Sequence, residues 1–303
     1  MKSLFILLAT ATAAMKPVYY GNSTIVANAL ISDELCCVVL GAIHGSLDED
    51  EPPVDAKMNG YSITSGKGFQ DVSQVANGLK ATGHHYSFLF RFNQFTWDAM
   101  QADLQTPRER AEANQGGDKG MIGNLMQKFS QITGFSLNCN LVSANHVGLA
   151  QLCYATLSEL AEAYPSVRWD ISFPIFIQDG ETGLFPAGGK SVLDLLHQDS
   201  FKIDSLTLDF NSLHLLSNAT SQLIPMIQTT IDQVVEIVAP YQGKLELVVM
   251  VPLVETGDLG LIHQVVSQIG RNAHVKRLAF NDSIASTKSL QYAKQFLDPS
   301  VVL

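Results

Sequence analysis

The chain has 303 residues, and its 29 acidic against 19 basic side chains give a formal net charge of −10. Apolar residues make up 46% and charged residues 16%, a balance that supports a packed core and excludes a disordered polyelectrolyte. The acidic excess argues against a nucleic-acid-binding surface, because no basic stripe is available. No stretch is apolar for long enough to predict a membrane span.

The first fourteen residues have the pattern of a cleaved secretory signal. Lys2 precedes the apolar run 4–8, and small residues then offer an Ala-x-Ala site with cleavage after Ala13 or Ala14. An ordinary N-terminal strand and a start at Met15 are the alternatives. We expect a secreted protein in which residues 1–14 are the signal peptide and residues 15–303 form one domain.

Short apolar runs alternate with longer amphipathic stretches along the whole chain. Most of the runs are continuously apolar, as in strands that are covered on both faces. The expected strands are 17–20, 36–43, 86–92, 134–141, 168–177, 203–210, 244–253 and 275–280. The expected helices are 69–80, 147–163, 191–197, 221–238, 259–269 and 287–296, with Gly83 as a left-handed stop after the first of them.

Alternating strands and helices predict a parallel sheet, and this number of units predicts a closed (β/α)8 barrel. An open doubly wound sheet is the competing architecture, which the lack of a Gly-x-Gly-x-x-Gly turn after the first strand disfavours. Two polar segments are interpreted as excursions from the barrel. The acidic run Asp48–Glu51 reads as an exposed loop, and residues 101–119 read as a mobile segment at the active face.

The functional side chains of such barrels lie at the carboxyl ends of the strands. The polar residues that end the expected strands are His44, Arg91, Asn93, Asn138, Asn140, Gln178, Asp179, Asp209, Asn211, Glu255, Asn281 and Asp282. No His-x-His or His-Glu-x-x-His spacing supports a metal site, and no phosphate-binding loop is present. We therefore expect neither a metal nor a cofactor.

Three segments carry a resemblance to a known family. Residues 95–100 read Phe-Thr-Trp-Asp-Ala-Met, residues 134–140 read Gly-Phe-Ser-Leu-Asn-Cys-Asn, and residues 206–211 read Leu-Thr-Leu-Asp-Phe-Asn. Together they resemble the chitinase-like glycosidases of glycoside hydrolase family 18. That family has an aromatic-Thr-Trp segment after its third strand, Asp-x-Asp-x-Glu on its fourth and Met-x-Tyr-Asp at the end of its sixth.

The resemblance places Ser136, Asn138 and Asn140 where the family has its three acids. In the family the Glu protonates the leaving glycosidic oxygen, and the central Asp orients the N-acetyl group of the substrate. An Asn amide cannot deliver that proton, and losing a general acid costs about a hundred- to ten-thousand-fold in rate. The resemblance implies a chitinase-like protein without hydrolase activity that binds N-acetylglucosamine-type glycans, or a protein partner, at the carboxyl-end face.

The predicted ligand-binding residues are Ser136, Asn138, Asn140, Asp209, Phe210, Trp97, Arg91, Asn93 and Asp282. Alternation along a strand directs the first three toward the barrel interior, where a purely structural polar layer is the other interpretation. Trp97 either stacks on a sugar ring or packs at the start of a helix. Two further hypotheses are an active glycoside hydrolase that uses Asp209 and Glu255 as its carboxylate pair, and an inert barrel that acts as an inhibitor or structural partner.

Overall fold

The computed structural model describes residues 18–21, 37–48, 51–91, 94–105, 120–129, 131–138, 147–174, 202–210, 220–241, 245–253, 268–269, 272 and 274–282. The predicted helices 191–197 and 287–296 lie outside these residues, and so do the predicted signal peptide, Asn93, Asn140 and Glu255.

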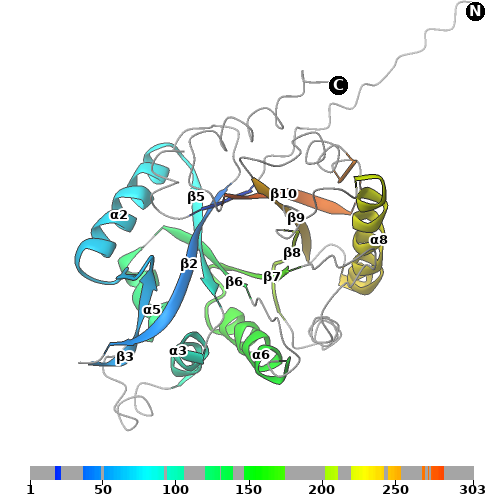
Figure 1. Ribbon diagram of the computed structural model, residues 1–303. Helices are drawn as coiled ribbons and strands as arrows, with labels where there is room; N and C mark the ends of the chain where they lie inside the picture. Colours follow the sequence, from blue (N-terminus) through cyan, green and yellow to red (C-terminus); the bar gives the residue numbers. More distant parts are fainter. Residues whose placement is uncertain are drawn as a thin grey trace, which may run out of the picture.

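Eight strands form a closed ring of parallel pairs (Figure 1). They are β1 (Val18–Gly21), β2 (Cys37–Asp48), β5 (His85–Arg91), β6 (Ile132–Asn138), β7 (Arg168–Pro174), β8 (Ser205–Asp209), β9 (Glu246–Leu253) and β10 (Val275–Asp282). The ring closes because β1 pairs in parallel with both β10 and β2. All eight predicted strands are confirmed, and the chain is a (β/α)8 barrel.

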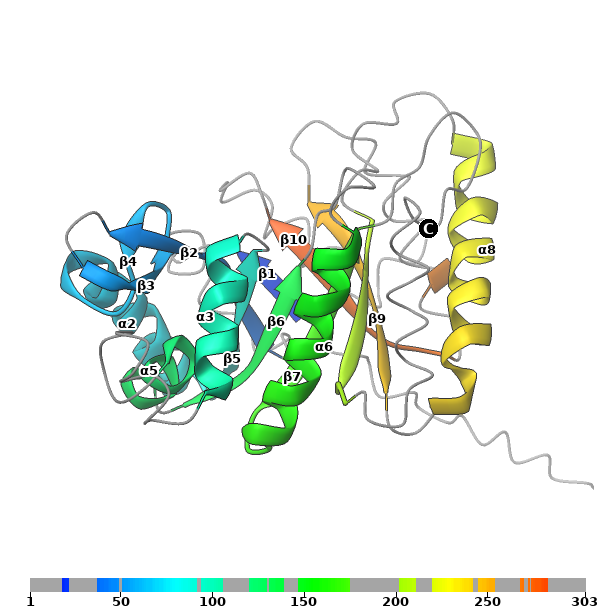
Figure 2. The same cartoon turned by 90° about the horizontal axis from the view of Figure 1, so that it is seen from below.

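Helices surround the barrel on its outer side (Figures 1 and 2). They are α2 (Gly66–Ala81), α3 (Gln94–Leu104), α5 (Met121–Lys128), α6 (Val147–Ala163) and α8 (Thr220–Val238), the last continued by the short 3-10 helix η4 (Ala239–Tyr241). The predicted helices 69–80, 147–163 and 221–238 are confirmed, and residues 268–269 of the predicted helix 259–269 are helical. Of the helices described, none combines the length and apolar character that crossing a membrane requires.

The main core lies between the barrel and the helices. Phe90 on β5, Phe135 on β6 and Trp169 on β7 pack side by side, with ring centroids 5.5 Å and 5.1 Å apart. Leu157 and Leu160 of α6 are fully buried in the same cluster. Burying an apolar side chain of this size contributes about 1.5 to 3 kcal/mol, so these contacts hold the helices on the barrel wall.

The end of α2 has the stop that the sequence predicts. Gly83 takes a positive φ of 75°, and its N–H donates to the Lys80 carbonyl at 2.9 Å. The next N–H, of His84, donates to the Leu79 carbonyl at 2.8 Å. These bonds satisfy carbonyls that the last turn of a helix leaves open, so the chain turns directly into β5.

Two strands that the sequence analysis did not predict lie beside β2, on the far side of the acidic run 48–51. β2 runs on to Asp48, and β3 (Glu51–Met58) pairs with it antiparallel, with Asp48 opposite Glu51. β3 then turns through Asn59 and Gly60, whose φ values are 54° and 81°, into β4 (Tyr61–Ser62). Two positive φ values are typical of the tight turn that best joins antiparallel strands. The sequence analysis did not predict β3 or β4. The two residues between Asp48 and Glu51 lie outside the described chain, so the exposed acidic loop stays a prediction there.

The mobile segment predicted for residues 101–119 was wrong for its first four residues, which are helical. Gln101–Leu104 belong to α3, where Gln101 donates to the Thr156 hydroxyl of α6 at 2.5 Å. Asp103 is buried and accepts hydrogen bonds from the N–H groups of Ile122 and Gly123 at 2.9 Å and 3.2 Å. An acidic side chain that reads as solvent-exposed thus caps the amino end of α5. Residues 106–119 lie outside the described chain.

Candidate functional site

The side chains of β6 alternate between the helix-facing core and the barrel interior. Phe135 and Leu137 are fully buried in the main core cluster. Ser136 and Asn138 therefore point to the opposite side of the strand, into the barrel. The same alternation on β7 directs Asp170 and Ser172 inward, because the intervening Ile171 lies in the main core.

Three inward-pointing residues meet at the carboxyl ends of β6, β7 and β8. The Asn138 amide donates to the Ser172 hydroxyl at 3.2 Å and to the Asp209 carboxylate at 3.4 Å. Ser172 is fully buried, and Asp209 is 6% exposed. We refer to Asn138, Ser172 and Asp209 as the carboxyl-end cluster. It joins Asn138 and Asp209 from the predicted ligand set and adds Ser172, which the sequence analysis missed because Ser172 lies inside a strand and not at its end.

The remaining predicted ligand residues at this edge fall into two groups. Arg91 ends β5, lies opposite Asn138 in the strand register and is exposed. Asp282 ends β10, and the structure describes its backbone position alone. Asn93, Asn140 and Glu255 lie outside the described residues.

Two predicted aromatic ligands pack against the core. Phe210 is fully buried in the main core cluster, so it faces the helices and we leave it out of the site. Trp97 is half-buried and packs against the same cluster near the start of α3. The Thr96 hydroxyl ties this helix to β5 by donating to the Arg91 carbonyl at 3.1 Å. Stacking of Trp97 on a sugar stays a prediction.

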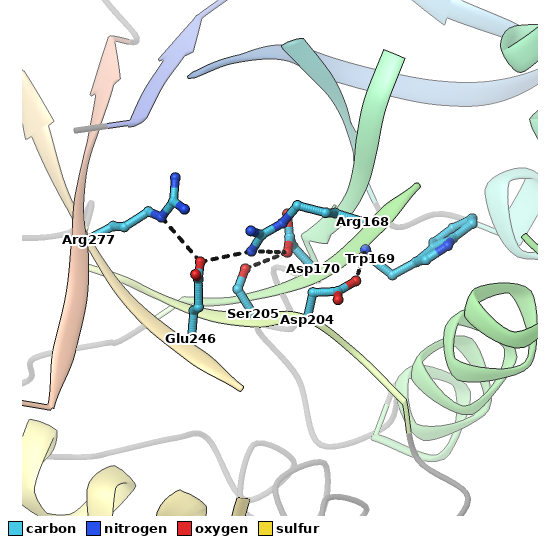
Figure 3. A network of polar contacts seen from close by, with 7 residues as sticks. All are labelled: Arg168, Trp169, Asp170, Asp204, Ser205, Glu246 and Arg277. Atoms are coloured by element: carbon cyan, nitrogen blue, oxygen red, sulfur yellow. Dashed lines mark hydrogen bonds and ion pairs between the residues drawn. The ribbon is translucent and has the colours of Figure 1, made fainter. Parts of the chain in front are cut away.

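A second group of polar side chains lies at the amino end of the barrel interior (Figure 3). The Arg168 guanidinium binds the Glu246 carboxylate at 2.9 Å, and the Arg277 guanidinium contacts the same carboxylate at 3.2 Å. The Ser205 hydroxyl donates to Asp170 at 2.5 Å, and Arg168 lies 3.8 Å from Asp170. These five residues, Arg168, Asp170, Ser205, Glu246 and Arg277, form the amino-end network.

Trp169, which lies between Arg168 and Asp170 on β7, belongs to the main core and not to the network. Its side chain points away from the network (Figure 3). Its ring N–H donates to the Tyr164 carbonyl at 3.1 Å. Its backbone N–H donates to the Asp204 carboxylate at 2.8 Å. The side chains of successive β7 residues thus point alternately into the barrel interior and toward the outer core.

The carboxylates of the amino-end network have opposite pKa shifts. Burial raises the pKa of Asp170 to about 6, against the opposing effects of Arg168 and the Ser205 hydrogen bond. The pKa of Glu246 is lowered, because the hydrogen bond and charge of Arg168 and the charge of Arg277 outweigh its partial burial. The Arg168 pKa is raised by the neighbouring carboxylates, Asp170 first among them, although burial opposes the rise. The network therefore keeps Glu246 charged, whereas Asp170 binds a proton at mildly acidic pH.

The amino-end network was missed by the sequence analysis, which, apart from Ser136 and Trp97, considered residues at the carboxyl ends of strands. Charged residues two positions apart within an apolar strand, as in Arg168-Trp-Asp170, were the available signal. A charge at such a position must face either water or a partner. The partner Glu246 lies 78 residues away along the chain, so the sequence alone could not identify it.

The carboxyl-end cluster can bind polar groups by hydrogen bonds. An amide offers two donors and an acceptor, a hydroxyl offers both, and a carboxylate accepts. The cluster contains one carboxylate, whereas the usual hydrolysis of a glycosidic bond uses a pair. Within the described part of the chain, no group of three or more His, Cys, Asp or Glu side chains is placed to hold a metal ion.

Comparisons with known proteins support the fold and not a family. No protein-family model matches this chain, and a search of curated proteins finds no match. Among solved structures, the catalytic domain of a family GH18 chitinase from the fern Peteris ryukyuensis aligns with a TM-score of 0.53 and 14% identity, over 92% of this chain and 97% of that one.

Two further solved structures align less well. An intracellular xylanase of Thermoanaerobacterium saccharolyticum gives a TM-score of 0.49 at 11% identity, over 88% of this chain and 85% of that one. A bee venom hyaluronidase gives 0.43 at 10%, over 92% of this chain and 95% of that one. These two alignments carry no argument. The alignment with the chitinase domain supports the (β/α)8 barrel architecture of the chain and nothing beyond the fold.

Proposed function

We propose that this protein is a secreted, chitinase-like barrel that binds N-acetylglucosamine-type glycans at the carboxyl ends of its strands without hydrolysing them. The observation that carries the proposal is Asn138. It occupies an inward-facing position on β6 where the family resemblance implies a carboxylate, and its amide is engaged with Ser172 and Asp209.

The chemistry of the cluster favours binding over cleavage. Asn138 stands where the resemblance implies the Asp that orients the N-acetyl group, and its neutral amide cannot supply the charge of that carboxylate. The proton donor of the family corresponds to Asn140, whose amide releases no proton to a leaving group. Arg91 lies beside Asn138 in register and adds an exposed donor at the same edge. Sugar hydroxyls and acetamido groups are both donors and acceptors, so they match an edge made of amide, hydroxyl, carboxylate and guanidinium groups.

Binding is tested with purified protein and chitotetraose by calorimetry. We expect measurable affinity that falls about tenfold or more in Asp209→Asn, because a hydrogen bond to a charged group contributes about 1.5 to 3 kcal/mol. Glu162→Gln is the matched control, since it also exchanges a carboxylate for an amide, on the outer surface. If chitotetraose does not bind, the glycan proposal fails, and binding of a protein partner becomes the hypothesis to test.

Turnover of a fluorogenic chitobioside tests the absence of hydrolysis. We expect no rate above background. The competing hypothesis, an active glycoside hydrolase, is favoured by the position of Asp209 at the carboxyl end of β8. It predicts turnover of a glycan that is abolished by both Asp209→Asn and Glu255→Gln. Turnover that survives both substitutions contradicts that mechanism.

Secretion rests on the sequence of residues 1–14. Expression of the full chain in a secreting host, followed by N-terminal sequencing of the product, is the direct test. We expect a mature chain that begins after Ala13 or Ala14. A product in the medium that retains Met1, or one that stays in the cell, contradicts the proposal.

A further inference from the structure

The inward-facing residues of the barrel lie in layers that alternate strands fill. In barrels of this kind the four side chains of one layer come from every second strand. The hydrogen bond between Asn138 and Asp209 shows this arrangement, because it joins β6 to β8 across the intervening β7. Ser136 and Thr207 lie two residues earlier on the same two strands. They therefore share the next layer toward the amino end of the barrel.

The other two members of that layer follow from the same register. Thr207 pairs with Val248, which neighbours Arg277 of β10, and the offset of two residues seen between β6 and β8 then selects Ala279. On β2 the corresponding residue is Val39, which packs with Ala279 in a small apolar cluster inside the barrel. Three of the four members, Ser, Thr and Ala, are smaller than the Val, Ile and Leu side chains that usually fill these layers.

Two buried hydroxyls of this layer have no hydrogen-bond partner among the described residues. Ser136 is fully buried and Thr207 is 1% exposed, and neither the Ser136 Oγ nor the Thr207 Oγ1 is hydrogen-bonded to that part of the chain. A buried hydroxyl without a partner is costly, and native proteins rarely leave two in one place. Something that donates and accepts hydrogen bonds is required at this position.

Asp170 supplies a third polar group next to this layer. It lies directly opposite Ser136 in the register of β6 and β7. Its contacts with Ser205 and Arg168 are both made by Oδ1, so neither of them uses Oδ2. A buried water molecule typically makes about three hydrogen bonds to polar groups that the protein leaves open. Two hydroxyls and one carboxylate oxygen are a suitable set.

We propose that the barrel interior binds an ordered water molecule between Ser136, Thr207 and Asp170, directly below the carboxyl-end cluster. The water donates to Asp170 and exchanges hydrogen bonds with the two hydroxyls. It connects the amino-end network to the floor of the carboxyl-end cluster, since Ser172 and Thr207 are register partners. This site does not depend on glycan binding and exists whether or not the proposed function is right.

Thermal unfolding of Thr207→Val is the first test, because Val keeps the shape of Thr and removes its hydroxyl. If the hydroxyl binds water, its loss lowers Tm by about 2 °C. If the hydroxyl is dry and without a partner, the substitution removes a penalty and Tm rises. Ser136→Ala is expected to lower Tm in the same way. A rise or no change in both variants overturns the proposal.

Thr156→Val is the control, because the Thr156 hydroxyl donates to the Leu152 carbonyl at 2.8 Å and accepts from Gln101 at 2.5 Å, and so is satisfied by the protein alone. It is expected to lower Tm whatever the barrel contains, and it sets the scale for losing a satisfied hydroxyl.

A crystal structure of the wild-type protein at high resolution is the second test and does not depend on the variants folding. We expect a density peak within hydrogen-bond distance of Ser136 Oγ, Thr207 Oγ1 and Asp170 Oδ2, and its absence in Thr207→Val. Empty space between these atoms in the wild type, or a side chain that fills it, overturns the proposal.

Discussion

The two ends of the barrel interior are both polar, but they are built from different chemistry. At the amino end, two guanidinium groups share the Glu246 carboxylate, and Asp170 lies against them. At the carboxyl end, the amide of Asn138 joins a hydroxyl and the Asp209 carboxylate. The amino end pairs opposite charges within the protein, whereas the carboxyl end is assembled mostly from neutral groups that can also bond to a ligand. This comparison separates a structural role at one end from a binding role at the other.

The largest expected effect is the pH dependence that Asp170 imposes on stability. Its pKa is raised to about 6, so the folded state binds its proton more tightly than the unfolded state does. The resulting stability is present below the unfolded pKa, about 4, and is lost as the pH rises through about 6. Relative to Asp170→Asn, the wild type should lose on the order of 3 kcal/mol of unfolding free energy across this window. Urea unfolding at a series of pH values measures the difference.

Glu246 has the opposite effect on the pH dependence of the unfolding free energy. Its pKa is lowered, so its contribution to stability is present above its usual pKa and is lost as the pH falls through the folded value. Parallel pH profiles for the wild type and Asp170→Asn would contradict the burial argument for Asp170.

The next largest effect is expected from breaking the charge pairs at the amino end. Glu246→Gln keeps the shape of the side chain but removes the charge that both Arg168 and Arg277 contact. We expect a loss of about 2 kcal/mol in unfolding free energy, because hydrogen bonds between charged groups are involved. Affinity for chitotetraose should stay unchanged. A loss of glycan binding with intact stability would reverse the roles that we assign to the two ends.

A smaller effect on stability is expected at the carboxyl end. Asn138→Leu removes the donor to Ser172 and Asp209 while keeping a similar volume. We expect a loss of about 1 kcal/mol in unfolding free energy, together with weaker glycan binding. Chemical denaturation and calorimetry on the same sample measure both. A destabilisation larger than that of Glu246→Gln would mean that this end, too, is mainly structural.

The smallest effect is expected on the outer surface. Glu162→Gln removes the ion pair with Lys202, whose side chains are 48% and 60% exposed. Exposed pairs contribute little, so the unfolding free energy should change by less than about 0.5 kcal/mol. Urea unfolding checks this value. A larger change would show that exchanging a carboxylate for an amide is not neutral in this protein, and would weaken the interpretation of the other variants.

Most of the fold could be predicted from the sequence. All eight barrel strands were expected, because continuous apolar runs mark strands that are buried on both faces. The β3–β4 hairpin was missed, since its Pro residues and acidic side chains are typical of loops when read in isolation. Asp103 was grouped with a polar excursion, because its role as a cap for α5 depends on a helix that begins at Met121.

The site was predicted less completely. Asn138 and Asp209 were expected at strand ends, but their hydrogen bond spans 71 residues of sequence. Phe210 was expected to face a ligand and instead packs toward the helices, since it follows Asp209 and alternation turns it outward. Ser172, Thr207 and the amino-end network were not singled out. Unlike Ser136, they belong to no segment that resembles the family's strand-four motif, and their partners across the barrel cannot be identified from the sequence.

The sequence by itself predicted the alternation of strands and helices, the closed parallel barrel and the inward direction of Ser136 and Asn138. These properties follow from local periodicity, which every short segment carries. Only the tertiary structure decided which inward residues share a layer, because that depends on the offset between neighbouring strands around the ring. The same offset brought Asn138 to Asp209 and placed two buried hydroxyls beside Asp170, where no local pattern could have indicated their contact.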